Sequence, residues 1–168
     1  MATLPAFLAP AVVRWRPMQA DDVAYVAALE AQIHAAPWTV ANFRDALAAG
    51  YSARVGEREG RIVAYGVLMP APGEAQLLNL SVVPDTRRAG LGRELLEQFL
   101  VDAQRLNAEQ VFLEVRVSNI PAIALYERAG FERIARRVAY YPVTPSDSSR
   151  EDALVMRRRV NVNLDLGG

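Results

Sequence analysis

One stretch decides the fold of this chain: Asn79-Leu80-Ser81-Val82-Val83-Pro84-Asp85-Thr86-Arg87-Arg88-Ala89-Gly90-Leu91-Gly92-Arg93. It predicts an apolar strand that ends at a proline, a basic turn with two glycines, and an amphipathic helix that begins at once. The first N–H groups of a helix have no partner inside the helix, and the helix dipole adds positive potential there. The sequence therefore predicts that phosphate binds above this turn.

The residues of this turn exclude three common phosphate loops. A Walker loop and a protein-kinase glycine loop both need a lysine, and the chain contains none. A dinucleotide fingerprint needs a third glycine at the position that Leu95 occupies. A loop of the form Arg-x-x-Gly-x-Gly remains, in which Gly90 and Gly92 allow a ligand to approach the backbone. A tight turn with solvated arginines stays open as the alternative.

Composition limits the class of protein. The chain has 168 residues, 52% hydrophobic and 23% charged, which predicts a single soluble domain over residues 1–168. We expect residues 1–11 to form an arm and residues 161–168 a disordered tail. Nineteen basic and nineteen acidic residues cancel, so we expect no nucleic-acid partner.

The chain has no cysteine and one histidine, so we expect neither a metal site nor catalysis by a thiolate. No apolar run is long enough to span a bilayer, so we expect no membrane partner and a cytoplasmic location. Nothing in the sequence indicates an oligomeric state.

Hydrophobic periodicity predicts strands that alternate with helices, hence a mixed α/β sheet with helices on both faces. Strands are expected at 12–16, 51–57, 61–69, 75–83, 110–117, 131–139 and 153–160. Helices are expected from Asp21 or Asp22 to about His34, from Thr39 to Gly50, after Gly90, and from Ser118 or Asn119 to Gly130. A polar loop is expected from Pro142 to Asp152.

A second motif is Leu113-Glu114-Val115-Arg116-Val117-Ser118-Asn119. Glu114 stands in an otherwise apolar strand, where a charge is costly unless it is paired or hydrated. One interpretation is an ion pair with Arg116, since residues two apart share a face of a strand. The other, which we favour, is a general base at a cleft.

A third motif runs from Asn119 to Phe131. Asn119 and Tyr126 are seven positions apart, so they lie nearly in line on one helix face, about 10 Å apart. Taken alone, Asn119 is a helix N-cap and Tyr126 an amphipathic core residue. Neither role excludes contact with a ligand.

The three motifs, in this order and spacing, resemble the GNAT superfamily of acyl-CoA-dependent N-acyltransferases. Arg87 to Gly92 is similar to its pyrophosphate loop, and Asn119 to Phe131 to its Asn…Ala-x-x-Leu-Tyr-x-x-x-Gly-Phe signature. Within the superfamily the chain most resembles the RimI-type ribosomal-protein-alanine N-acetyltransferases. That closer similarity rests on Pro37-Trp38-Thr39, Asn79-Leu80-Ser81-Val82, Leu113-Glu114-Val115-Arg116, Ala122-Ile123-Ala124-Leu125-Tyr126, Tyr140-Tyr141-Pro142 and Arg150-Glu151-Asp152-Ala153.

The resemblance implies a mostly antiparallel central sheet in which one parallel strand pair splays apart to hold acetyl-CoA. It implies direct attack of the amine on the thioester, with Glu114 as the base and Tyr126 as the acid that protonates the thiolate. The implied cofactor-binding residues are Leu80, Ser81, Val82, Arg87, Arg88, Ala89, Gly90, Leu91, Gly92, Arg93, Asn119 and Tyr126. No cysteine is present as an acyl carrier, which agrees with direct transfer.

For the acceptor, the resemblance implies the N-terminal peptide of a protein, a small-subunit ribosomal protein with N-terminal alanine. The implied contacts are Trp38, Tyr140, Tyr141 and Glu151. The aromatic residues alternatively pack the loops, and Glu151 and Asp152 alternatively pair with Arg136 and Arg137. We expect His34 to be structural or a surface residue near the acceptor loop. Two other functions stay open: acetylation of a small amine, and acetyl-CoA binding without catalysis.

Overall fold

The computed structural model describes residues 12–86, 90–143 and 149–160. Its strands are β1 (Arg14–Pro17), β2 (Ser52–Arg58), β3 (Arg61–Ala71), β4 (Glu74–Val82), β5 (Gln110–Arg116), β6 (Glu132–Pro142) and β7 (Arg150–Arg159). Its α-helices are α1 (Val23–Ile33), α2 (Val40–Ala48), α3 (Leu91–Arg105) and α4 (Ile120–Arg128), with short 3-10 helices at Ala20–Asp22 and Pro84–Thr86.

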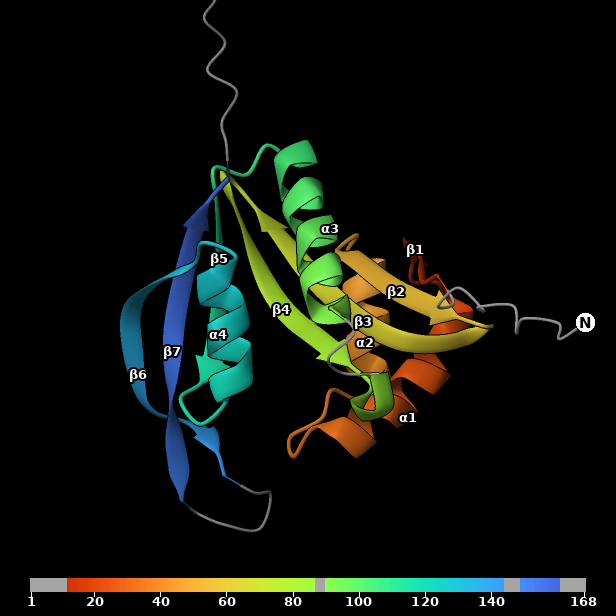
Figure 1. The fold of residues 1–168 in the computed structure, drawn as a ribbon, viewed down its shortest axis with the longest axis horizontal. Coiled ribbons are helices and arrows are strands. Elements are labelled where there is room, and N and C mark those ends of the chain that lie inside the picture. Colours follow the sequence, from red (N-terminus) through yellow and green to blue (C-terminus); the bar gives the residue numbers. More distant parts are fainter. Residues whose placement is uncertain (1–11, 87–89, 144–148, 161–168) are drawn as a thin grey trace, which may run out of the picture.

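The seven strands form one sheet in the order β1-β2-β3-β4-β5-β7-β6 (Figure 1). Each neighbouring pair is antiparallel except β4 and β5, which run parallel. The mixed, mostly antiparallel sheet that the sequence predicted is thus confirmed, and β5 lies inside it as its apolar sequence indicated.

The sequence predicted a loop from Pro142 to Asp152, but in the structure both ends of this range belong to strands. β6 extends to Pro142 and β7 begins at Arg150, with Tyr141 opposite Glu151 and Pro142 opposite Arg150. The Asp152 carboxylate accepts the backbone N–H of Ala139 at 2.8 Å, so polar side chains take part in the hairpin. Pairing with the neighbouring strand therefore outweighs the turn-like composition of this segment.

Local signals in the sequence set the helix ends. Thr39 caps α2: its hydroxyl accepts the N–H of Asn42 at 3.2 Å, and the Asn42 side chain accepts the N–H of Thr39 at 2.9 Å. Gly90 precedes α3 with φ of 75°, a conformation that glycine adopts without strain. Asn119 caps α4 by accepting the N–H of Ala122.

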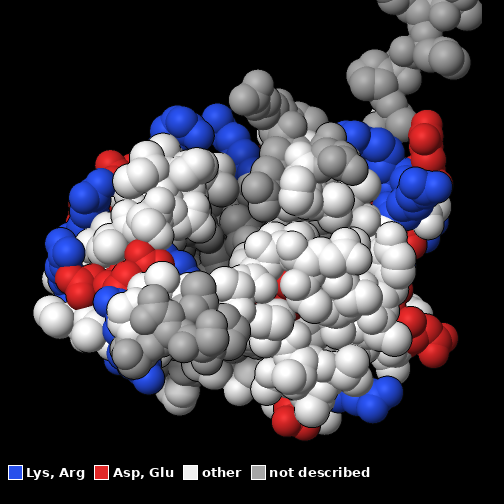
Figure 2. All heavy atoms as spheres, turned by 90° about the horizontal axis from the view of Figure 1, so that it is seen from below, with Lys and Arg blue, Asp and Glu red and all other residues white. Residues whose placement is uncertain are grey.

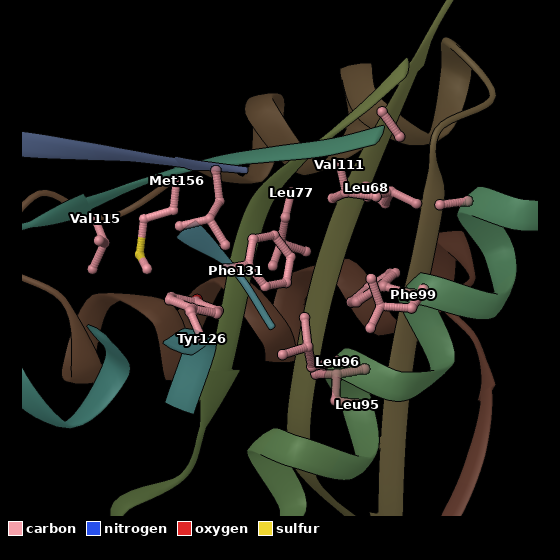
Figure 3. Packing of buried hydrophobic residues seen from close by; sticks show 14 of the residues in the cluster. Leu68, Leu77, Leu95, Leu96, Phe99, Val111, Val115, Tyr126, Phe131 and Met156 are labelled. Carbon is pink, nitrogen blue, oxygen red and sulfur yellow. The ribbon is translucent and has the colours of Figure 1, made fainter. Parts of the chain in front are cut away.

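Helices cover both faces of the sheet, as predicted (Figure 1). On one face, α1 and α2 bury Val23, Val26 and Phe43 against β2 and β3. On the other face, α3 and α4 pack over the centre of the sheet, where Leu95, Leu96 and Phe99 of α3 and Tyr126 of α4 join the strand residues shown in Figure 3. Gly66 allows this close packing, because a Cβ there would lie 2.7 Å from Phe99.

Charges of both signs share the face shown in Figure 2. Arginines and acidic side chains gather toward its edge, and its middle is mostly uncharged. Within residues 12–86, 90–143 and 149–160, no helix has the length and apolarity that a membrane crossing requires.

A buried ion pair joins α3 to β2. Asp102 is 7% exposed and accepts hydrogen bonds from Arg54 Nε at 2.6 Å, Arg54 Nη2 at 2.7 Å and the Ser52 hydroxyl at 2.7 Å. Burial opposes ionisation of Asp102, but the hydrogen bonds from Arg54 and Ser52 outweigh it and hold the pKa of this carboxyl below its ordinary value. Because folding lowers this pKa, ionised Asp102 stabilises the fold at pH values above the ordinary pKa of a carboxyl.

We expect Asp102→Asn to lower the free energy of unfolding by about 3 kcal/mol at pH 7, because Arg54 stays buried without its anion. Acid protonates Asp102 in the wild type too, so the difference narrows as the pH falls below about 4. Urea unfolding of both proteins at several pH values measures this. The exposed Asp45→Asn is the control, and an equal loss in that variant would contradict the role of the ion pair.

Candidate active site

The site begins where the two parallel strands separate. β4 and β5 pair from Glu74 opposite Gln110 to Leu77 opposite Leu113, although β4 continues to Val82 and β5 to Arg116. A cavity of about 240 Å³ opens between the separated ends and is lined by residues 78–81 of β4 and 114–116 of β5. The splayed strand pair that the family resemblance implied is present, and it places Glu114 at this cavity.

A second cavity, of about 650 Å³, follows the start of α3 and one side of α4. Residues 90–93, Pro121 and Leu125 line it. A Cβ on Gly92 would lie 3.3 Å from Leu125, so a larger residue there would narrow the space between the two helices. The N-terminal turn of α3 offers backbone N–H groups for an anion. The predicted contacts Arg87, Arg88 and Ala89 lie outside the described residues.

The two cavities meet. Six residues line both: His34, Leu80, Ser81, Asn119, Ala122 and Tyr126. The larger cavity thus joins the start of α3, which suits a phosphate, to the junction, and the smaller cavity shares that junction. The residues present therefore suit acetyl-CoA and an amine acceptor.

Glu114 is held by residues that sequence analysis did not connect with it. Its side chain is 13% exposed, and Arg137 Nε lies 3.0 Å from Glu114 Oε1. A hydrogen bond with Glu114 also raises the pKa of Tyr140. The alternative of a Glu114–Arg116 pair is wrong, because Arg116 Nη1 instead binds Glu151 at 3.0 Å. Glu114 and Arg116 share a face of β5, but each has a partner on another strand: Arg137 of β6 for Glu114 and Glu151 of β7 for Arg116.

Tyr126 lies on α4 at the junction of the cavities. It is 7% exposed, and its ring packs edge-on against Phe131 with centroids 5.8 Å apart. Burial raises the pKa of Tyr126 above that of an ordinary tyrosine, so its hydroxyl keeps its proton at neutral pH. Asn119, at the N-terminal end of the same helix, also lines both cavities. The predicted alignment of the two residues on one helix face is consistent with this placement.

Two of the predicted acceptor contacts line the smaller cavity. Trp38 does so while packing on Phe43, with ring centroids 5.1 Å apart. Tyr141 does so under the Arg116 guanidinium, which lies 4.6 Å from the ring centroid, and burial raises the pKa of Tyr141 to about 12. Tyr140 packs against Tyr141 at 4.9 Å.

Glu151 is in neither lining. Its carboxylate instead accepts hydrogen bonds from Arg116 at 3.0 Å and from the Ser118 hydroxyl at 3.1 Å. Of the alternative pairings proposed for the two acidic residues, only that of Asp152 with Arg136 occurs. Glu151 is thus linked to the smaller cavity through Arg116, which lines it.

Sequence analysis missed a buried polar network on the α1 side of the junction. Glu30 is 2% exposed and accepts hydrogen bonds from the Tyr65 hydroxyl at 2.7 Å and from Asn79 Nδ2 at 3.1 Å. The Ser81 hydroxyl donates to Asn79 Oδ1 at 2.7 Å, and His34 Nε2 lies 2.8 Å from Ser81 Oγ. His34 was expected to be structural or a surface residue near the acceptor loop. Its side chain is 40% exposed and lines the smaller cavity with Trp38, and it also lines the larger cavity.

One signal in the sequence points to this network. The buried stripe of α1 runs through Val23, Val26 and Ala27, and its next position is Glu30, where a charge is unexpected. His34 follows four residues later, at the C-cap of the same helix.

Comparisons with known proteins agree with this geometry. Residues 18–131 match the model of the acetyltransferase (GNAT) family. The ribosomal protein bS18-alanine N-acetyltransferase of Escherichia coli K12 is 35% identical over 139 residues, which cover 83% of this chain and 92% of that protein.

Solved structures show the same fold. The crystal structure of the Escherichia coli ribosomal-protein-S18-alanine N-acetyltransferase has a TM-score of 0.84 and 32% identity, covering 92% of this chain and 98% of that one. Ard1 from Thermoplasma volcanium has a TM-score of 0.80 and 30% identity, covering 89% and 99%. The chain therefore belongs to the GNAT family and is an acetyl-CoA-dependent N-acetyltransferase.

Proposed function

We propose that this protein acetylates the α-amine at the N-terminus of another protein, an alanine of a small-subunit ribosomal protein. The observation that carries the proposal is the meeting of the two cavities at six shared residues. An amine in the smaller cavity reaches the junction beside Glu114, and an acyl donor in the larger cavity reaches it beside Tyr126. The name of the Escherichia coli relative supports the choice of acceptor.

The proposed roles follow from this arrangement. Acetyl-CoA, when bound, supplies the acetyl group as a thioester. Glu114 removes a proton from the amine, directly or through water, and Tyr126 gives its proton to the departing thiolate. Residues 80–82 of β4 and Asn119 line the path of the pantetheine arm, and residues 87–93 receive the pyrophosphate. Trp38, Tyr140 and Tyr141 form or support the acceptor wall, and Glu151 positions Arg116.

The chemistry of the amine favours an N-terminus over a lysine. An α-amine has a pKa of about 8 and a lysine side chain about 10.4. At neutral pH the α-amine is therefore easier to deprotonate by about 3.3 kcal/mol. Positioning and one carboxylate base suffice more readily for this acceptor.

The test uses the purified protein, acetyl-CoA and a synthetic peptide with the N-terminal sequence of the bS18 protein from the same organism, beginning with alanine and containing one lysine. Tandem mass spectrometry of the product locates the acetyl group. We expect it on the α-amine and not on the lysine. The same peptide with a blocked N-terminus is the control and should stay unmodified. Turnover of small amines such as polyamines, without turnover of the peptide, would contradict the proposed acceptor.

A further inference from the structure

Glu30 is a buried carboxylate without a fixed cation. The chain contains no lysine, and among the described residues no arginine forms an ion pair with Glu30. Its basic neighbour is His34, whose Nε2 lies 3.7 Å from Glu30 Oε1. A buried carboxylate needs polar partners, and His34 lies at the edge of this network and lines both cavities.

The hydrogen bonds of the network determine which nitrogen of His34 carries a proton. Asn79 donates its Nδ2 hydrogens to Glu30, so Asn79 Oδ1 is the acceptor for the Ser81 hydroxyl. A serine hydroxyl has one hydrogen, which is used in that bond. His34 Nε2 must therefore donate to Ser81 Oγ across the 2.8 Å between them. In the neutral imidazole, Nδ1 is left as the proton acceptor.

His34 also lies where the reaction takes place. It lines both cavities, as does Tyr126 from the opposite side, and its side chain is 40% exposed. It therefore meets solvent and a bound amine while Glu30 beside it stays buried. Glu114 lines the smaller cavity as well, and its charge is matched by Arg137.

The reaction releases more protons than one base removes. An α-ammonium has three N–H protons and the amide product keeps one, so two leave the nitrogen as the N–C bond forms and the C–S bond breaks. One is balanced by the thiol of CoA and the other goes to solvent. We propose that His34, held by Ser81 across 2.8 Å, is a second proton acceptor for the amine beside Glu114. The inference rests on the proposed amine acetylation.

Several charged or titratable groups surround His34, from every element that forms the cavity. They are Glu30 of α1, Tyr65 of β3, Arg93 of α3, Glu114 and Arg116 of β5, Tyr126 and Arg128 of α4, and Tyr141 of β6. Glu30 is the carboxylate within 4 Å of the imidazole.

The test replaces His34 with glutamine, whose amide N–H can still donate to Ser81 but which takes up no proton. We expect kcat/KM for the acceptor amine to fall by about tenfold or more. His34→Ala should lose as much, and added imidazole should restore part of its rate. Gln32→Ala, an exposed change on the same helix outside both cavities, is the control and should keep the wild-type rate.

Glu30→Gln disturbs the hydrogen bonds through which Asn79 and Ser81 hold His34, so it should lower kcat without changing KM for acetyl-CoA. A His34→Gln enzyme with the wild-type rate would overturn the inference, and so would a His34→Ala enzyme that imidazole fails to rescue. Wild-type turnover on a small amine alone would contradict only the proposed acceptor, since the same variants then test His34 with that amine. Failure of the wild type on every amine would reject both.

Discussion

Glu114→Gln is expected to lower kcat for acetyl transfer by about 10²- to 10³-fold at neutral pH, the usual range for loss of a general base. Glutamine keeps the shape of the side chain, which is 13% exposed on β5, but it cannot take a proton. Acetyl-CoA should bind with unchanged affinity, because Glu114 lines the smaller cavity and not the larger one. Initial rates over a range of pH and calorimetric titration with acetyl-CoA measure the two effects.

Two controls separate the base from other effects of this change. Glu109→Gln makes the same substitution at an exposed residue just before β5 and should leave the rate unchanged. Arg137→Met removes the ion pair but keeps the carboxylate. If Arg137→Met lost as much activity as Glu114→Gln, orientation by the ion pair and not proton removal would be the function of Glu114. An unchanged pH profile in Glu114→Gln would also contradict the role of base.

Tyr126→Phe is expected to lower kcat by about 10²-fold, because only the proton for the leaving thiolate is lost. A thiolate leaves readily, so the effect should be smaller than that of Glu114→Gln. The ring still packs on Phe131, so the unfolding temperature should stay close to that of the wild type. Burial raises the pKa of Tyr126, which keeps the hydroxyl protonated as the pH rises. The wild-type rate should therefore not fall through loss of this proton below about pH 10.

Rates and thermal unfolding of Tyr126→Phe are compared with those of Tyr25→Phe, an exposed change on α1. The expected result is a slow, folded enzyme for Tyr126 and a normal enzyme for Tyr25. A Tyr126→Phe enzyme with the full rate would remove the acid role. A large fall in its unfolding temperature would show that the hydroxyl serves the fold instead.

Much of the fold could be predicted because its signals are local. The proline and glycines around Gly90, the Thr39 cap and the apolar run of β5 each act within a few residues of the chain. The hairpin of β6 and β7 was predicted less well. Its polar residues are paired by a neighbouring strand, and that pairing depends on contacts that composition does not show.

In the candidate site, too, some residues could be predicted from the sequence and others could not. Glu114, Asn119 and Tyr126 come from one continuous segment, so their order along the chain predicts that they lie together. Arg137 reaches Glu114 only because β6 and β7 follow β5 in the sheet. Glu30 and His34 meet Asn79 and Ser81 across nearly fifty residues of sequence. No spacing rule links residues that far apart, and the side-chain directions depend on how α1 packs on β4.

By itself, therefore, the sequence determined the strand-to-helix turn, the order of strands and helices, and the family whose motifs they carry. These depend on backbone preferences and short periodic patterns. The tertiary structure alone decided which side chains face the junction of the two cavities, and which ion pair or hydrogen bond holds each of them. Those contacts arise from packing between distant elements, where a shift of one residue in register turns a side chain to the opposite face.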